Sequence, residues 1–246
     1  MQTLSLVLTV ATAFCTLGLT AAQLEKPADS LALESVLKTM DTAAANFHTT
    51  QAEFEWDSYE KVINEVDEIQ TGTIYFRRSG KDIEMMADVK MAGPDLKNLK
   101  QERKNVLYSG GKISIYQPKI EQVTVYDLGK NKVDLESYVV LGFGGSGHDL
   151  TKSFDVTYVR PETIDGAATA QLQLIPKSEK VRNNYNKILL WIDLDRGISL
   201  QQQFFSPQGD YRLTKYTSIQ LNEKKIPDDV FKLKTNGKTK TISPKG

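Results

Sequence analysis

Apolar and polar residues alternate along most of this chain, and few folds are compatible with that alternation. Ile83, Met85 and Val89 stand at alternate positions among mostly charged neighbours, a spacing typical of a strand with one buried face. Turns such as 109–112 (SGGK) and 117–119 (QPK) join successive segments. Connections this short link only antiparallel neighbours. The sequence therefore predicts an antiparallel meander of about eleven strands in a mainly β protein with a few helices.

The predicted strands continue almost to the end of the chain. Those with the clearest bounds are 73–78, 154–160, 170–175, 185–194, 198–205 and 211–221. Residues 195–197 (DRG) and 206–210 (SPQGD) form later hairpin turns. No repeat, low-complexity tract or long linker divides the strands, so we expect one domain over residues 23–246.

One helix is expected before the first strand. Asp29 or Ser30 is a suitable cap for it. Apolar residues then recur at intervals of three and four, which indicates an amphipathic helix: Leu33, Val36, Leu37, Met40, Ala44 and Phe47.

Residues 1–22 are expected to be an export signal that is removed from the mature protein. The segment has no charged side chain and ends in the small residues Thr20, Ala21 and Ala22, which resemble a signal-peptidase site. It lacks the Lys or Arg of a typical signal. An uncleaved membrane anchor over residues 4–22 is the alternative, because this length just reaches across a bilayer.

Charge and cysteine content exclude several functions. The chain carries 31 basic and 31 acidic residues, so no net charge directs it to nucleic acid. Its one cysteine, Cys15, lies in the export segment. The mature chain therefore offers no disulfide, thiol nucleophile or thiolate metal site.

One interval, 129–152 (GKNKVDLESYVVLGFGGSGHDLTK), interrupts the strands. Asp134 is positioned to cap a short helix. This helix would carry Leu135, Tyr138 and Val139 on one face. A short apolar helix on a flexible loop over one side of a sheet suggests a lid.

Glycines in the same interval match G-x-G-x-x-G at Gly142, Gly144 and Gly147. A dinucleotide fingerprint needs a preceding parallel strand and a following helix within a crossover, and neither is predicted here. Ser146 is not in a nucleophile elbow, because His148 stands where that motif needs glycine. We interpret the segment as a mobile loop.

Other patterns for catalysis or metal binding are sparse. His48 and His148 are not clustered with cysteines or with carboxylates at metal-ligand spacing. Two acidic pairs have the spacing of one strand face, which is usually the solvated face: Glu53 with Glu55, and Asp193 with Asp195. We expect no enzyme activity, and therefore no catalytic residue, metal or cofactor.

The candidate binding site is an apolar face on an open sheet. Only the first helix and the short lid helix are available to cover it. A curved sheet with aromatic and methionine side chains suits a flexible apolar ligand, and an ordinary filled core is the alternative. The residues expected on the concave face are Phe54, Trp56, Ile74, Phe76, Met85, Ala87, Ile115, Val125, Leu190 and Ile192.

Arg78 has the same strand parity as Ile74 and Phe76. If those two side chains point inward, the guanidinium does too, and it then needs acceptors such as the carbonyl groups of a lid. The alternative is that Arg78 has reached the strand end and is solvated.

Several motifs together resemble periplasmic lipoprotein carriers of the LolA type. An amphipathic helix precedes Gly72, Ile74, Phe76 and Arg78 at alternate positions. The resemblance continues over nearly all of the mature chain, in 111–122 (GKISIYQPKIEQ), 174–177 (LIPK), 192–199 (IDLDRGIS) and 226–231 (IPDDVF). Two departures are Ser79, where the family usually has proline, and methionines in 83–91, where a tryptophan is common.

The resemblance implies an unclosed antiparallel half-barrel with helices over its mouth. In the family, the cavity takes up acyl chains of lipoproteins from the inner membrane and delivers them to the outer membrane, and the arginine that matches Arg78 holds the lid closed. The implied partners are acylated lipoproteins or lipids, an inner-membrane lipoprotein-releasing ABC transporter and an outer-membrane acceptor. The carrier is expected to be a periplasmic monomer. A carrier of another lipid, or a periplasmic lipid or lipoprotein sensor of the same fold, is the alternative.

Overall fold

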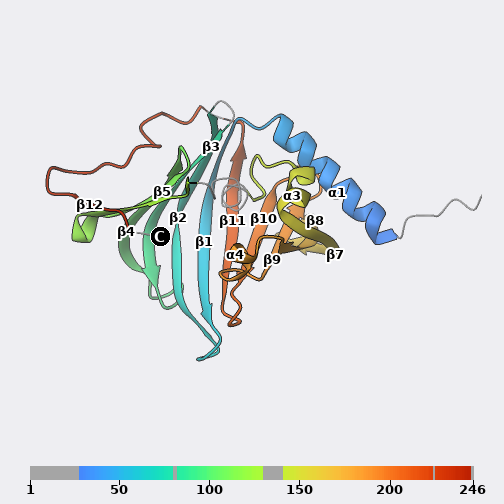
Figure 1. Ribbon diagram of the computed structural model, residues 1–246, viewed down its shortest axis with the longest axis horizontal. Helices are drawn as coiled ribbons and strands as arrows, with labels where there is room; N and C mark the ends of the chain where they lie inside the picture. The colour runs from blue at the N-terminus through green and yellow to red at the C-terminus, as the bar shows by residue number, and fades with distance from the viewer. Residues whose placement is uncertain (1–27, 80–81, 130–140, 224, 245–246) are drawn as a thin grey trace, which may run out of the picture.

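Twelve strands form one curved sheet in the part of the chain that the structure describes (Figure 1). The structure is a computed structural model, and it describes residues 28–79, 82–129, 141–223 and 225–244. The first meander contains β1 (Thr49–Glu60), β2 (Glu65–Ser79), β3 (Asp82–Gly93), β4 (Lys100–Ser109), β5 (Lys112–Gln117) and β6 (Gln122–Asp127). The second contains β7 (Phe154–Ile164), β8 (Ala167–Pro176), β9 (Lys187–Asp193), β10 (Ser199–Phe205) and β11 (Tyr211–Leu221).

Strand β1 joins the two meanders because it pairs with β11 as well as with β2. The order across the sheet is β12-β6-β5-β4-β3-β2-β1-β11-β10-β9-β8-β7. The end strands β7 and β12 do not pair with each other in this order, so the predicted unclosed half-barrel is confirmed. The prediction of an all-antiparallel sheet is wrong at one pair, because β12 (Lys240–Ile242) runs parallel to β6.

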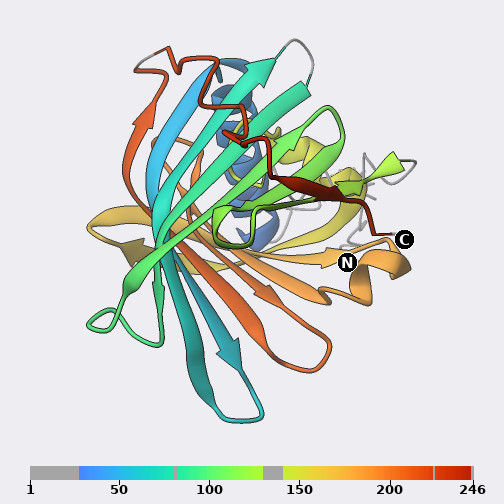
Figure 2. The same ribbon diagram turned by 90° about the vertical axis from the view of Figure 1, so that its left-hand side faces the viewer.

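Helix α1 (Ala28–Ala45) lies on the concave side of the sheet (Figure 2). Its predicted apolar face is buried at Val36, Leu37 and Met40, which pack on fully buried leucines and isoleucines of β8 and β9. Asp29 and Ser30 lie inside the first turn of the helix rather than at its cap. The periodicity therefore predicted the helix and its buried face, but its start lies earlier than the predicted cap.

Three short helical segments complete the described fold. They are η1 (Pro118–Ile120), α3 (Gly147–Ser153) and α4 (Glu179–Arg182). The interpretation of the glycine segment as a mobile loop is wrong for α3, which Ser146 caps by accepting a hydrogen bond from the main-chain N–H of Asp149. The predicted lid residues Leu135, Tyr138 and Val139, with their cap Asp134, lie outside the described residues.

The C-terminal segment covers part of the convex face. Ile226 and Phe231 are buried against Met86 of β3. Arg77 places its guanidinium over the Phe231 ring, 4.2 Å from the centroid, and forms an ion pair with Asp228 at 2.5 Å. The 226–231 motif of the sequence therefore fastens this segment to the sheet.

Gly72 marks the close approach of β2 and β3. The register between these strands shifts next to Gly72, and an added Cβ there would lie 2.0 Å from the carbonyl oxygen of Asp88. Only glycine fits such a contact without movement of the backbone. The motif needs this glycine for sheet geometry.

Candidate functional site

Apolar side chains line up across the concave face because the strand registers place them opposite one another. Phe76 on β2 lies opposite Met85 on β3, and Met85 lies opposite Tyr108 on β4. Where the two meanders meet, Phe54 on β1 lies opposite Tyr216 on β11. Paired residues of neighbouring strands share a face. The result is one continuous apolar surface across both meanders.

One end of this surface is filled by Phe143, which is fully buried. Its ring stacks on Phe76 with 4.9 Å between centroids and meets the edge of Tyr216 at 4.9 Å. Phe54 and Ala87 are packed in the same cluster. This end is an ordinary core rather than open binding space.

Beyond Phe143 the concave face is hollow. A cavity of about 400 Å³ lies between the first meander, β10, β11 and the α4 segment. Trp56, Ile74, Phe76 and Met85, which the sequence placed on this face, line it. The remaining lining residues are Ile113, Val181, Asn184, Tyr185, Gln202, Phe204, Arg212, Thr214 and Tyr216.

A second cavity, of about 300 Å³, shares Trp56 and Arg212 with the first. Its other lining residues are Ser58, Gln70, Lys104, Val106 and Ile115, and Ile115 was predicted on this face. The Lys104 amine donates a hydrogen bond of 2.6 Å to the side-chain oxygen of Gln70. Burial lowers the pKa of Lys104, and the charge of the neighbouring Arg212 lowers it further. The charges of Glu68 and Glu102 oppose this shift. This cavity is therefore more polar and cationic than the first.

Other residues predicted on the concave face lie outside the two cavities. Phe54 and Ala87 belong to the core around Phe143, and Leu190 and Ile192 are fully buried in the core beneath α1. For these positions the filled-core alternative describes the packing. A direct lipid-binding role of each predicted residue stays a prediction.

The placement of Val125 on the concave face is wrong. Ile115 lies opposite Thr124, whereas Val125 lies opposite Ser114, and adjacent residues on a strand face opposite sides. The turn at η1 sets which face each residue of β6 occupies, and Glu121 in it has a left-handed φ of 49°. If the alternation of β5 is continued through this turn without a shift, Val125 is assigned to the same face as Ile115, which is incorrect.

Sequence reasoning missed Phe204 and Tyr216, although each alternates with residues of the opposite face on its own strand. Polar residues on the same face concealed the pattern. Gln202 and Thr214 are buried there and lie opposite each other in the register of β10 and β11. Gln202 donates a hydrogen bond to the carbonyl oxygen of Leu141, so the burial of its amide depends on a distant segment.

Arg78 connects the sheet with two segments on its concave side. Its guanidinium donates hydrogen bonds to the carbonyl oxygens of Ala44 and Gly144 at 3.1 Å, and its Nε donates to that of Phe47 at 3.2 Å. The residue lies near the end of β2 and is partly open to solvent. The sequence left two alternatives for Arg78, an inward side chain bound to carbonyl groups and a solvated side chain at the strand end, and each is correct in part. The residue lies at the strand end, and its guanidinium binds main-chain carbonyls.

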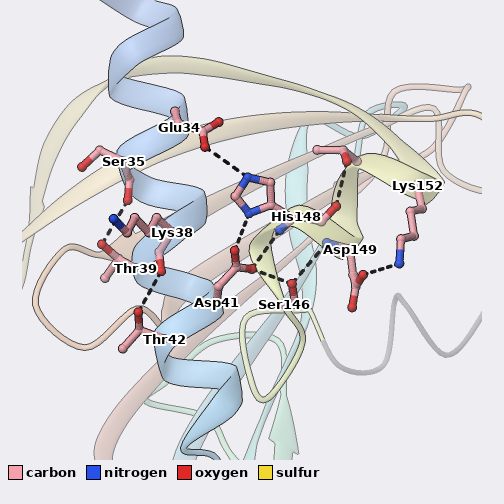
Figure 3. A network of polar contacts seen from close by, with 11 residues as sticks. Glu34, Ser35, Lys38, Thr39, Asp41, Thr42, Ser146, His148, Asp149 and Lys152 are labelled. Carbon is pink, nitrogen blue, oxygen red and sulfur yellow. Dashed lines mark hydrogen bonds and ion pairs between the residues drawn. The ribbon is translucent and has the colours of Figure 1, made fainter.

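A polar cluster joins α1 to α3 (Figure 3). The carboxylate of Asp41 accepts hydrogen bonds from the Ser146 hydroxyl at 2.5 Å and from the main-chain N–H of His148 at 3.1 Å. The His148 ring contacts Asp41 through Nδ1 and Glu34 through Nε2. The hydrogen bond with Asp41 raises the pKa of His148. The isolated histidine of the sequence is therefore part of a helix-to-helix joint.

The remaining polar motifs have structural roles. Asp193 accepts hydrogen bonds from the main-chain N–H groups of Asp195 and Arg196, and so shapes the turn between β9 and β10. Glu55 forms an ion pair with Lys215 at 2.5 Å. Within the described ranges, no three His, Cys, Asp or Glu side chains are grouped as metal ligands. The helices described there include none that is both long and apolar enough to cross a bilayer.

Comparisons with known proteins are informative at the level of structure. No family model and no curated protein sequence matches this chain. An uncharacterised conserved protein from Thermus thermophilus superposes with a TM-score of 0.53 at 8% identity, covering 87% of this chain and 99% of that one. MucB gives 0.49 at 13% identity, over 81% of this chain and 62% of its own length.

A LolA superfamily protein from Nitrosomonas europaea gives a TM-score of 0.40 at 14% identity, over 82% of this chain and 97% of that one. In the comparison with MucB, by contrast, the present chain spans less than two thirds of the other protein's length. At these identities the likeness is one of fold. The strand order and the helix on the concave side agree with the unclosed half-barrel covered by a helix that the sequence motifs implied.

Proposed function

We propose that this protein is a carrier that holds the acyl chains of lipoproteins or lipids on the concave face of its half-barrel. The observation that carries the proposal is the cavity of about 400 Å³ lined by Trp56, Met85, Phe204 and other apolar side chains. Its size lies in the range of small-molecule sites, roughly 300–1,000 Å³. Methionine and aromatic side chains adapt to flexible apolar ligands.

The division of the concave face supports this role. Phe143 fills one end, whereas the neighbouring surface stays hollow although the same strands run through both. A protein that needed only a stable core would gain free energy by filling this space, because cavities forfeit packing contacts. Retention of the space is consistent with a ligand that enters and leaves.

We also propose a cellular route for this carrier. The charge-free leader and the LolA-type motifs support export to the periplasm, uptake of lipoproteins from an inner-membrane ABC transporter and delivery to an outer-membrane acceptor. The positions of Arg78 and α1 are suited to a closing device at one end of the face.

A bulky substitution within the cavity tests the proposal. Ile113 lines it, and Ser114, the next residue on β5, faces the convex side. We expect Ile113→Trp to weaken binding of the apolar fluorescent dye N-phenylnaphthylamine at least tenfold. Because the added ring enters open space, the free energy of unfolding should fall by less than the roughly 1–3 kcal/mol of an overpacked core.

The control is Ser114→Trp, which adds a larger volume to the same strand and should leave dye binding unchanged. Titration of the dye and thermal unfolding are measured on the same preparations. Native mass spectrometry of the wild-type protein from a periplasmic fraction should in addition detect bound lipid. Equal dye affinity in the wild type and in Ile113→Trp would contradict the carrier function.

A further inference from the structure

Two cations face the interior of the half-barrel. Lys104 on β4 and Arg212 on β11 line the same cavity of about 300 Å³. Three strands separate β4 from β11 in the sheet order, so it is the curvature of the sheet that brings both side chains to one space. Trp56, Val106 and Ile115 supply apolar walls.

The charge of Lys104 is poorly compensated. Its amine donates to the neutral amide oxygen of Gln70, and none of the described carboxylates lies within ion-pair distance of it. Glu68 attracts the amine without forming an ion pair with it, and its carboxylate accepts a hydrogen bond from the amide nitrogen of the same Gln70. Glu102 also attracts the amine, while Arg212 repels it. A partly desolvated cation beside a second cation is unfavourable unless an anion joins them.

Arg212 has no hydrogen-bond acceptor or ion-pair partner among the residues that the structure describes. A cation on the same strand shows the contrast. Lys215 faces the convex side and pairs with Glu55 at 2.5 Å and with Asp57 at 2.9 Å. Within the described ranges, the cation of β11 that faces outward is therefore neutralised, whereas the inward guanidinium has no ion-pair partner.

The position of Arg212 links the cations to the apolar cavity, because Arg212 and Trp56 line both spaces. An arginine fork binds the oxygens of a phosphate or carboxylate in a bidentate manner, and a lysine adds a point charge. The adjoining space of about 400 Å³ is suited to a hydrocarbon chain. Together the two cavities have the polarity of an amphiphile with an anionic head.

We propose that Lys104 and Arg212 bind the anionic headgroup of a phospholipid-like amphiphile whose acyl chain occupies the adjoining apolar cavity. This inference rests on the proposed carrier function and names its ligand class. Trp56 lies between head and chain, and Gln70 orients the lysine amine. The ligand that fits is a lipid with one compact anionic head rather than a neutral or zwitterionic one.

The test compares three lipids with identical acyl chains: lysophosphatidylglycerol, lysophosphatidylcholine and monoacylglycerol. Each is titrated against bound N-phenylnaphthylamine, which carries no anion and reports the apolar cavity alone. The wild type should prefer the anionic lipid over both others by about tenfold or more, as expected for a charged hydrogen-bond pair. Inorganic phosphate, which lacks a chain, should not displace the dye.

The double variant Lys104→Met with Arg212→Met should lose this preference while still binding the dye and the neutral lipid. Arg103→Met is the matched control: it lies on β4 next to Lys104, faces the convex side and should keep the preference. Removal of the desolvated amine should leave the melting temperature unchanged or raised, whereas a large decrease would assign Lys104 a structural role and overturn the inference.

Equal affinity of the wild type for all three lipids, or an unchanged preference in the double variant, would likewise refute the headgroup site while the carrier function stands. Failure of every lipid to displace the dye would instead refute the carrier function itself. Displacement of the dye by phosphate alone would contradict the division into a head cavity and a chain cavity.

Discussion

The guanidinium of Arg78 donates hydrogen bonds to the main-chain carbonyl oxygens of three residues. This geometry explains why the position is occupied by an arginine. Ala44 belongs to the last turn of α1, and its carbonyl also accepts a hydrogen bond of 3.2 Å from the main-chain N–H of Phe47. Phe47 and Gly144 contribute carbonyls from the two segments beside it. A planar fork with five donors reaches them from two separate nitrogens, whereas a lysine amine carries its three donors on a single atom.

Replacement of Arg78 by leucine should open this end of the concave face while preserving the fold. The lost hydrogen bonds are partly open to water, so the expected cost is about 1 kcal/mol. Hydrogen exchange of residues 142–147 should accelerate, because the Gly144 carbonyl loses its contact with β2. The exposed Arg103 on the convex face provides the control substitution, Arg103→Leu. Unchanged exchange in Arg78→Leu would contradict the latch.

At the scale of single elements, α1 could be predicted because its apolar residues repeat over its whole length. Helix α3 could not, since its seven residues begin with glycine and bury only Gly147 and Leu150. Its formation depends on a tertiary contact: a Cβ at Gly147 would lie 2.4 Å from the Leu37 carbonyl oxygen of α1. Such a contact between distant segments cannot be predicted from the local sequence. Without it, the glycines of this segment indicate a loop.

The joint between α1 and α3 should loosen at alkaline pH. The hydrogen bond with Asp41 raises the pKa of His148, and the contact of the other ring nitrogen with Glu34 raises it further. Its stabilisation is therefore fully present below the ordinary histidine pKa of about 6.5 and is lost as pH rises through the raised value. Burial opposes ionisation of Asp41, but its bonds with Ser146 and His148 lower the pKa of Asp41 overall. Its own contribution is thus lost only in strong acid.

Hydrogen exchange of α3, corrected for the intrinsic pH dependence, should show full protection below the ordinary histidine pKa of about 6.5 and a decline as the pH rises above it. In His148→Gln the protection should be lower at pH 6 and nearly independent of pH. A parallel decline in both proteins would assign the effect to other groups.

At the scale of the whole molecule, alternation and short turns predicted the antiparallel meander, and the resemblance to LolA-type carriers implied that it forms an unclosed half-barrel. They could not determine where the concave face is filled and where it is hollow. Phe54 and Ala87 share one strand parity with the cavity residues, but their burial depends on Phe143, more than fifty residues away along the chain from the nearer of them. Phe143, and helix α1 over the second meander, therefore determine which of the predicted residues are packed in a core.

Removal of the Phe143 ring should therefore enlarge the binding space and lower the free energy of unfolding. Phe143→Ala should lower the free energy of unfolding by about 3–5 kcal/mol, as for other buried Phe to Ala changes. The vacated space lies beside Phe76 and Tyr216, which also line the apolar cavity. Lipids with longer acyl chains should then gain affinity relative to short ones.

Phe154→Ala provides the matched control, because Phe154 is equally buried but packs in the core beneath α1. It should lose similar stability without a change in chain-length preference. The measurement is dye displacement by a series of lipids that differ only in chain length, together with chemical unfolding of each variant. If Phe143→Ala and Phe154→Ala give the same chain-length profile, Phe143 does not limit the cavity, and the acyl chain must end elsewhere on the concave face.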